Sequence, residues 1–123
     1  MISTCSKPQT IVRLLLGTIA VVLLTLAPAR PSFAAWFTCK SVEVATYADR
    51  IHVRCTQAAS GGIVFFAVST ANSAHAARFL ASLLMAHTVG KDVVVEFDPS
   101  DTTGTAFGCA AHDCRRLLSV AVR

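Results

Sequence analysis

The N-terminus of this chain has the order of a secretory signal, and this constrains the rest of the molecule more than any other feature. Two basic residues, Lys7 and Arg13, precede an uncharged apolar run from residue 14 to residue 27. Two prolines then interrupt the run, and the small residues Ser32 and Ala34 occupy the two positions that a signal peptidase reads. The pattern predicts cleavage after Ala34 and export from the cytoplasm.

Cleavage there divides the chain into a signal peptide, residues 1–34, and a single domain, residues 35–123. An uncleaved membrane anchor is the alternative. We favour cleavage because a spanning helix needs about 20 apolar residues, whereas an apolar run of about 14 suits a signal. We therefore expect a secreted or periplasmic protein that meets the membrane only through its signal, before cleavage.

The charge of the predicted mature domain is close to balanced. Residues 35–123 hold eight lysines and arginines and seven aspartates and glutamates. The formal charge of +4 for the whole chain comes mostly from the signal. A near-neutral domain does not bind nucleic acid through bulk charge, so we expect no nucleic-acid partner.

Four cysteines remain after cleavage, and in a short exported domain they predict disulfides. Cys109 and Cys114 are five residues apart and close a tight loop, which leaves Cys39 to pair with Cys55. The second pairing is less direct. If residues 47–50 form a hairpin turn, cross-strand pairing sets Cys55 opposite Val42, so a bulge or a sheared register is needed to reach Cys39.

The segment from Cys109 to Cys114 also contains His112 and Asp113, which suggests a metal-dependent protein or a small periplasmic enzyme as the alternative. Zinc sites usually draw their ligands from two paired clusters, and this segment supplies one. No nucleophile and base stand in a recognised arrangement. We therefore expect no metal, no cofactor and no catalytic residue.

Hydrophobic periodicity predicts five strands and one helix. The strands are expected at residues 36–47, 50–55, 63–68, 91–97 and 115–123, with the helix at 73–89 and a long polar loop at 98–114. Asn72 or Ser73 can cap the start of the helix, and Gly90 can end it. The order β-β-β-α-β-β is that of an OB-fold barrel; a β-rich α+β sheet with one helix packed across it is the alternative.

Alternation along these segments also predicts a core. The expected core residues are Phe65, Phe66, Val68, Phe79, Leu83, Val93, Val95 and Val120. His87 falls on the apolar stripe of the helix, where we expect it to satisfy the last helical carbonyls rather than to act as a functional group. The aspartates of residues 98–104 could hold calcium, but they also suit ordinary Asx turns.

Several of these segments resemble the B subunits of AB5 toxins of the subtilase-cytotoxin and typhoid-toxin kind. The resemblance covers about residues 50–116. It rests on the apolar strand 63–69, Phe79-Leu80 in the helix, the strand start 89–93 and the late cysteines after Gly108. It implies an exported OB-fold that assembles from identical subunits and binds cell-surface glycans. The spacing of the first cysteine pair differs from that of the family.

Arg50, His52 and Arg54 alternate with apolar residues and therefore share the outward face of one strand. We interpret them, together with the loop from residue 98 to 112, as the contact surface of a non-enzymatic binding module. The expected ligand is an anionic glycan or an acidic exported protein. The alternative is a solvated edge strand whose positive charge discourages pairing with other chains.

Overall fold

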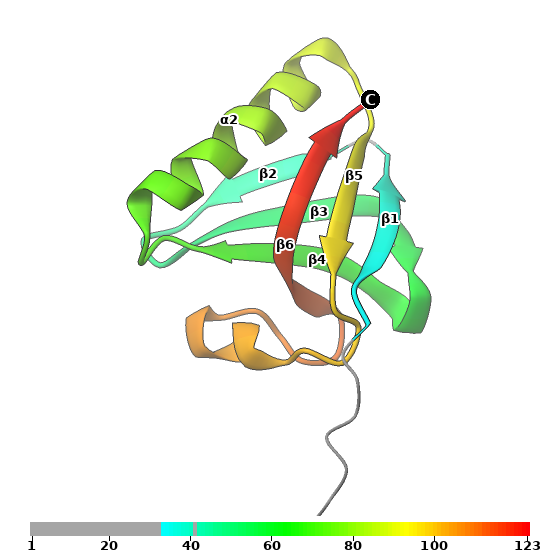
Figure 1. Ribbon diagram of the computed structural model, residues 1–123, viewed down its shortest axis with the longest axis vertical. Helices are drawn as coiled ribbons and strands as arrows, with labels where there is room; N and C mark the ends of the chain where they lie inside the picture. Colours follow the sequence, from blue (N-terminus) through cyan, green and yellow to red (C-terminus); the bar gives the residue numbers. More distant parts are fainter. Residues whose placement is uncertain (1–32, 41) are drawn as a thin grey trace, which may run out of the picture. The chain divides into compact units, whose positions relative to one another are not determined.

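The computed structural model describes residues 33–40 and 42–123, and the predicted signal lies almost entirely outside the described residues. Within them the chain forms six strands, one helix and two short 3-10 turns (Figure 1). The elements are β1 (Ala35–Cys39), β2 (Glu43–Thr46), β3 (Arg50–Ala59), η1 (Ser60–Gly62), β4 (Ile63–Ser69), α2 (Ser73–Val89), β5 (Val93–Phe97), η2 (Thr103–Phe107) and β6 (Cys114–Val122).

The single first strand expected at residues 36–47 is wrong, because two strands occupy this region. β1 pairs antiparallel with β5, whereas β2 pairs antiparallel with β3. The chain changes neighbours at Lys40, whose carbonyl accepts hydrogen bonds from the backbone N–H and the hydroxyl of Thr56, at 3.3 and 3.0 Å. Because the chain changes neighbours at Lys40, this one segment contributes β1 to one end of the sheet and β2 to the other.

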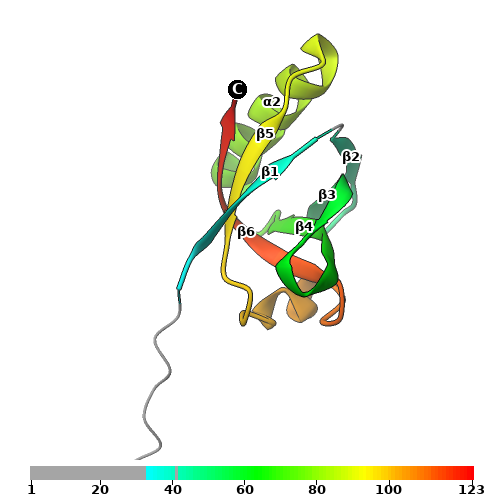
Figure 2. The same ribbon diagram turned by 90° about the vertical axis from the view of Figure 1, so that its right-hand side faces the viewer.

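All six strands form one mixed sheet in the order β1-β5-β6-β4-β3-β2. β4 and β6 run parallel and the other neighbours run antiparallel. Because β1 and β2 follow each other in the chain yet stand at opposite ends of this order, the sheet has to curl back on itself. The result is a half-barrel, with α2 running past β2 and β6 (Figures 1 and 2).

The helix has the predicted bounds and both predicted caps. The Asn72 side chain accepts a hydrogen bond from the backbone N–H of His75 at 3.0 Å. Gly90 ends the helix with φ +65°, in the left-handed region that favours glycine. The buried face holds Ala76, Phe79, Leu83 and Ala86. His87 lies outside that face, contrary to the predicted apolar stripe.

The predicted core is confirmed for six of its eight residues, namely Phe66, Val68, Phe79, Leu83, Val93 and Val95. Phe65 and Val120 are only partly buried. Phe65 points to the opposite side of β4 from Phe66, as neighbouring strand residues must. Leu118 lies at a bulge, since Glu96 pairs with Ser119 and Phe97 pairs with Leu117, and Val120 resumes the inward alternation near the end of the sheet.

Both predicted disulfides are present, with Cα–Cα distances of 5.2 Å for Cys39–Cys55 and 5.3 Å for Cys109–Cys114. Glu43 pairs with Arg54, so the register does set Cys55 level with Val42, as expected. The break after β1 carries Cys39 across to it without a bulge in β2. Two disulfides indicate an oxidising extracellular or periplasmic environment. In residues 33–40 and 42–123, no helix is long and apolar enough to cross a membrane.

Candidate functional site

The three predicted site residues lie together on the outer face of β3. Ile51, Val53 and Cys55 fill the interior, so the alternate residues Arg50, His52 and Arg54 face outward. On this side β3 is flanked by β2 and by β4. The predicted grouping of Arg50, His52 and Arg54 on one face therefore exists.

Two aromatic rings that the sequence analysis did not assign to the site complete this surface. Tyr47, in the turn before β3, lies 4.1 Å under the Arg50 guanidinium and 6.1 Å from the His52 ring, edge to face. His52 also stacks on Phe65 of β4, with 5.1 Å between ring centres. We call Tyr47, Arg50, His52, Arg54 and Phe65 the outer-face cluster. The Tyr47 ring is 50% exposed, so it remains open to a ligand.

The Cys109–Cys114 loop supports this cluster from one side. The sulfur of Cys114 lies 3.5 Å from Nε2 of His52. Gly108 has φ +85°, and a Cβ placed on it would come within 2.5 Å of the Arg50 guanidinium. A side chain at position 108 is therefore excluded twice, by the backbone conformation and by Arg50. The backbone of the loop at Gly108 therefore packs closely against the Arg50 guanidinium.

The positive charges of the cluster are compensated. Arg50 forms an ion pair with Asp49 at 3.0 Å, and Arg54 forms one with Glu43 at 3.2 Å. Burial lowers the pKa of His52, repulsion from Arg50 lowers it further, and Asp113 partly opposes both. The imidazole is therefore neutral at neutral pH. The surface is better described as aromatic with hydrogen-bond donors than as a basic patch.

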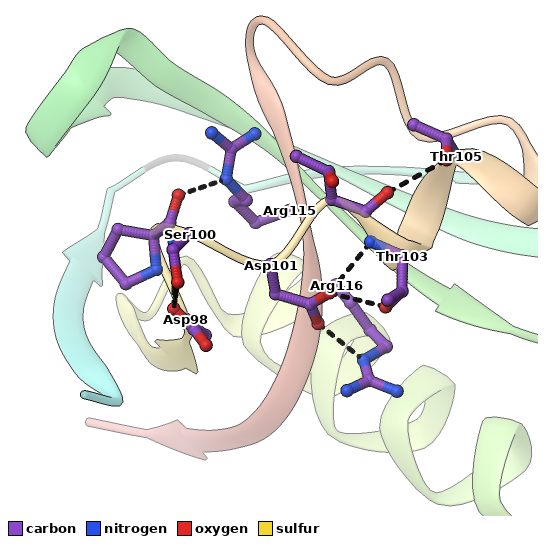
Figure 3. Close-up of polar contacts among 9 residues, drawn as sticks. Asp98, Ser100, Asp101, Thr103, Thr105, Arg115 and Arg116 are labelled. Atoms are coloured by element: carbon purple, nitrogen blue, oxygen red, sulfur yellow. Dashed lines mark hydrogen bonds and ion pairs between the residues drawn. The ribbon is translucent and has the colours of Figure 1, made fainter. Parts of the chain in front are cut away.

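The long loop after β5 is held by two successive Asx turns (Figure 3). Asp98 accepts hydrogen bonds from the backbone and hydroxyl of Ser100, at 2.8 and 2.7 Å. Asp101 does the same with Thr103, at 2.8 and 2.6 Å. These bonds to Thr103, with help from Arg116, hold the pKa of Asp101 below its ordinary value against the effect of burial. A calcium site in this loop would need carboxylate oxygens as ligands, and Oδ1 of Asp98 and Oδ1 of Asp101 instead accept hydrogen bonds within the turns.

Sequence reasoning missed the two arginines that tie this loop to β6. Arg115 donates from Nε to the Pro99 carbonyl at 2.6 Å and from Nη1 to the Ala111 carbonyl at 2.7 Å. Arg116 pairs through Nε with Asp101 at 3.1 Å (Figure 3). One pattern in the sequence could have indicated these contacts. Arg115 and Arg116 directly follow Cys114 at the start of the last strand, and the loop before that strand is rich in aspartates.

Among the described residues, the alternative site at His112 and Asp113 gains no third metal-ligating neighbour. Nε2 of His112 lies 3.4 Å from the Asp113 carboxylate, and the His112 side chain is 82% exposed. Cys109 and Cys114 are bonded to each other and offer no thiolate. Across the part of the chain that the structure describes, no three metal-ligating side chains come together.

His87 has a structural contact different from the one expected. A nitrogen of its ring, Nδ1, lies 2.8 Å from the carbonyl oxygen of Val42. The helical carbonyls of Ala86 and His87 are instead reached by the backbone N–H of Gly90 and its neighbour. The expectation that His87 satisfies the last turn of the helix is therefore wrong. It fixes the end of α2 against the chain between β1 and β2.

Comparisons with protein-family models, with curated proteins and with solved structures find no significant match for this chain.

Proposed function

We propose that this protein is an exported, non-enzymatic binding module that holds a glycan against the outer-face cluster. The observation that carries the proposal is the half-exposed Tyr47 ring, held from behind by Arg50 and bordered by a disulfide-closed loop. A rigid aromatic ring beside fixed hydrogen-bond donors suits a sugar, which presents an apolar C–H face and hydroxyl groups. Exposed aromatics on preorganised loops are common binding elements.

The strand order supports an OB-like reading of the fold. If β1 and β2 are the two halves of one bent strand, the chain has five strands with the helix between the third and fourth. β3 and β4 then become the second and third strands. In OB-folds this face, with the first and last loops, binds oligosaccharides and oligonucleotides. Here those loops are residues 47–49 and 98–113, which flank the cluster, and the near-neutral charge favours the sugar.

The resemblance to AB5 toxin B subunits points the same way, since it implies an exported glycan-binding OB-fold. It also implies several identical subunits, and several weak sugar sites on one assembly bind a cell surface far more tightly than one site does. An acidic protein partner is the second candidate. Such a partner would bind through the charges of Arg50 and Arg54. Asp49 and Glu43 already compensate these charges, so the glycan is the better candidate.

A glycan microarray with purified protein tests the proposal. Tyr47→Ala should weaken binding by about tenfold or more, as removal of a central aromatic contact does. Met85→Ala, which truncates an exposed residue on α2, is the matched control and should bind like wild type. Thermal melting of both variants separates lost binding from lost folding.

Charge variants distinguish the two ligands. Arg54→Glu alone should abolish capture of an acidic partner, and the exchanged pair Glu43→Arg with Arg54→Glu keeps the local ion pair and the net charge. A glycan held mainly by the Tyr47 ring should tolerate the exchange better than an acidic partner does. A well-folded Tyr47→Ala variant that binds every glycan like wild type would refute the proposal, as would turnover of a substrate by the pure protein.

A further inference from the structure

Strand β1 has one unpaired edge. It stands at one end of the strand order, and among the described strands it pairs only with β5 (Figure 2). Lys40, the next residue, directs its carbonyl to Thr56 and its N–H to the Gln57 side chain, both on β3. In an extended strand the backbone groups alternate between the two edges. Thr38 and Trp36 therefore direct their N–H and C=O groups to the same side as Lys40, away from β5.

The same alternation follows independently from the far side of β5. The Arg123 N–H donates to the Asp92 carbonyl at 3.0 Å, so Asp92 faces β6. Val93 and Val95 must then face β1, where they pair with Cys39 and Phe37. The backbone N–H and C=O groups of Trp36 and Thr38 are therefore open, and no described residue is hydrogen-bonded to them.

This edge lacks three of the usual protections against pairing with another chain, namely charge, proline and a bulge. Natural edge strands carry charges, prolines or bulges that block addition of a further strand. Ala35–Cys39 reads AWFTC, with no charge and no proline, and its pairing with β5 runs without a bulge. The Trp36 side chain is 60% exposed and borders a shallow groove on the outer face with Val94, Ala121 and Arg123.

We propose that two copies of this protein associate by pairing their β1 strands antiparallel about a two-fold axis at Phe37. In this register Trp36 of each copy stands opposite Thr38 of the other. The open N–H and C=O groups of both residues then form four backbone hydrogen bonds between the copies. The two tryptophans become diagonal neighbours on the outer face, a position from which large side chains make contact.

Two observations favour a second copy over an unrelated strand. β1 carries no charge, so pairing it with itself sets no like charges opposite each other. The open edge also ends at Lys40, which is already bonded to Thr56. The register centred on Phe37 places Ala35 of the second copy opposite Cys39, so a chain that begins at Ala35, as predicted for the exported form, stops before meeting β3.

The interface is small, since one short strand and one tryptophan contribute from each copy, and interfaces of this size form weak dimers. Sedimentation velocity of the purified exported protein over a wide concentration range should show a reversible monomer–dimer equilibrium. Amide hydrogen exchange should show that the N–H groups of Trp36 and Thr38 become protected as the concentration rises, while those of Val44 and Thr46 on β2 do not.

Trp36→Lys should weaken association about tenfold or more, because it places like charges across the two-fold axis. Met85→Lys adds the same charge to an exposed apolar residue on α2 and should leave association unchanged. Thr38→Pro is a second variant that tests the same pairing. It removes one of the open N–H groups, and its side chain lies on the same face of β1 as that of Trp36. A wild-type protein that stays monomeric at all concentrations overturns the proposal. So does an oligomer that Met85→Lys dissociates and Trp36→Lys does not.

Discussion

The two sides of the curled sheet each hold one disulfide and one phenylalanine of β4, and they differ in what surrounds them. On the inner side, Cys39–Cys55 and Phe66 belong to the main hydrophobic core with residues from five strands and the helix. On the outer side, Cys109–Cys114 lies in a small cluster with Ala67, against which Phe65 and Phe107 pack. Phe65 and Phe66 are adjacent in the sequence, yet they belong to clusters that are buried to very different extents.

The two disulfides have different roles, because one closes the fold and the other shapes the outer surface. The inner disulfide joins β1 to β3 at the corner where the sheet changes edge, so it closes the half-barrel. The outer disulfide closes a loop with a sequence separation of 5, which lies against His52 and brings Gly108 to Arg50. The first should govern stability, and the second should govern the geometry of the outer-face cluster.

The two phenylalanines of β4 provide the sharpest test of this difference. Phe66→Ala removes a ring that is fully buried and in contact with Phe97 at 5.0 Å between centres, so it should cost about 3–5 kcal/mol of unfolding free energy. Phe65→Ala removes a partly buried ring and should cost about half as much or less. Chemical denaturation of both variants measures the two values. Equal losses would mean that the outer cluster is as essential to folding as the core.

Removal of the inner disulfide should have the next largest effect. Cys39→Ala with Cys55→Ala opens a loop with a sequence separation of 16, which in the chain-entropy model costs about 3 kcal/mol. Because the sulfurs are also buried in the core, we expect a lower denaturation midpoint. The folded fraction should retain the proposed glycan binding. Reduction of the wild type would break both disulfides, so the control for the loss of the inner covalent bond alone is reduction of the Cys109→Ala with Cys114→Ala variant.

Compared with removal of the inner disulfide, removal of the outer disulfide should reduce stability less and should weaken ligand binding more. Cys109→Ala with Cys114→Ala opens a loop with a sequence separation of 5, for which the same model predicts about 2 kcal/mol. The freed loop should no longer hold Gly108 close to Arg50, so the proposed glycan binding should weaken even where the protein remains folded. A variant that binds like wild type would show that the loop does not shape the site.

The smallest expected effect is a pH dependence from His52. Its pKa in the folded protein lies below the ordinary value of 6.5, so the unfolded chain binds the proton more readily. The stabilisation by the neutral ring is complete above about pH 6.5 and is lost as the pH falls from there toward the folded pKa. Denaturation midpoints from pH 7.5 to 5 should show this decline in wild type. His52→Gln should flatten it, and an unchanged slope would assign the decline to another group.

Local patterns in the sequence predicted most of the regular elements. The strict alternation from residue 50 to 55 predicted both faces of β3, and the helix has the bounds and caps expected from Asn72 and Gly90. These features depend on residues within a few positions of one another, because side-chain direction repeats every two residues in a strand and capping acts within one turn of a helix.

Contacts between distant segments were not predictable in the same way. The arginine pair on β6 that holds the long loop, and the carboxylates that neutralise Arg50 and Arg54, depend on which side chains meet after folding. These ion pairs compensate the positive charges of Arg50 and Arg54, so the outer face is less basic than the sequence indicated. The aromatic members of the site were also hidden, since Phe65 reads as a core residue and Tyr47 as part of a turn.

The sequence by itself determined the single helix, the alternating faces and the pairing of the late cysteines, because each follows from short-range geometry. Only the tertiary structure decided that residues 36–47 form two strands at opposite ends of one sheet, which is how Cys39 reaches Cys55. It also decided that Phe65 turns outward to meet His52. The physical reason is that a curled sheet chooses its strand neighbours and its exposed face through long-range closure, which no local period encodes.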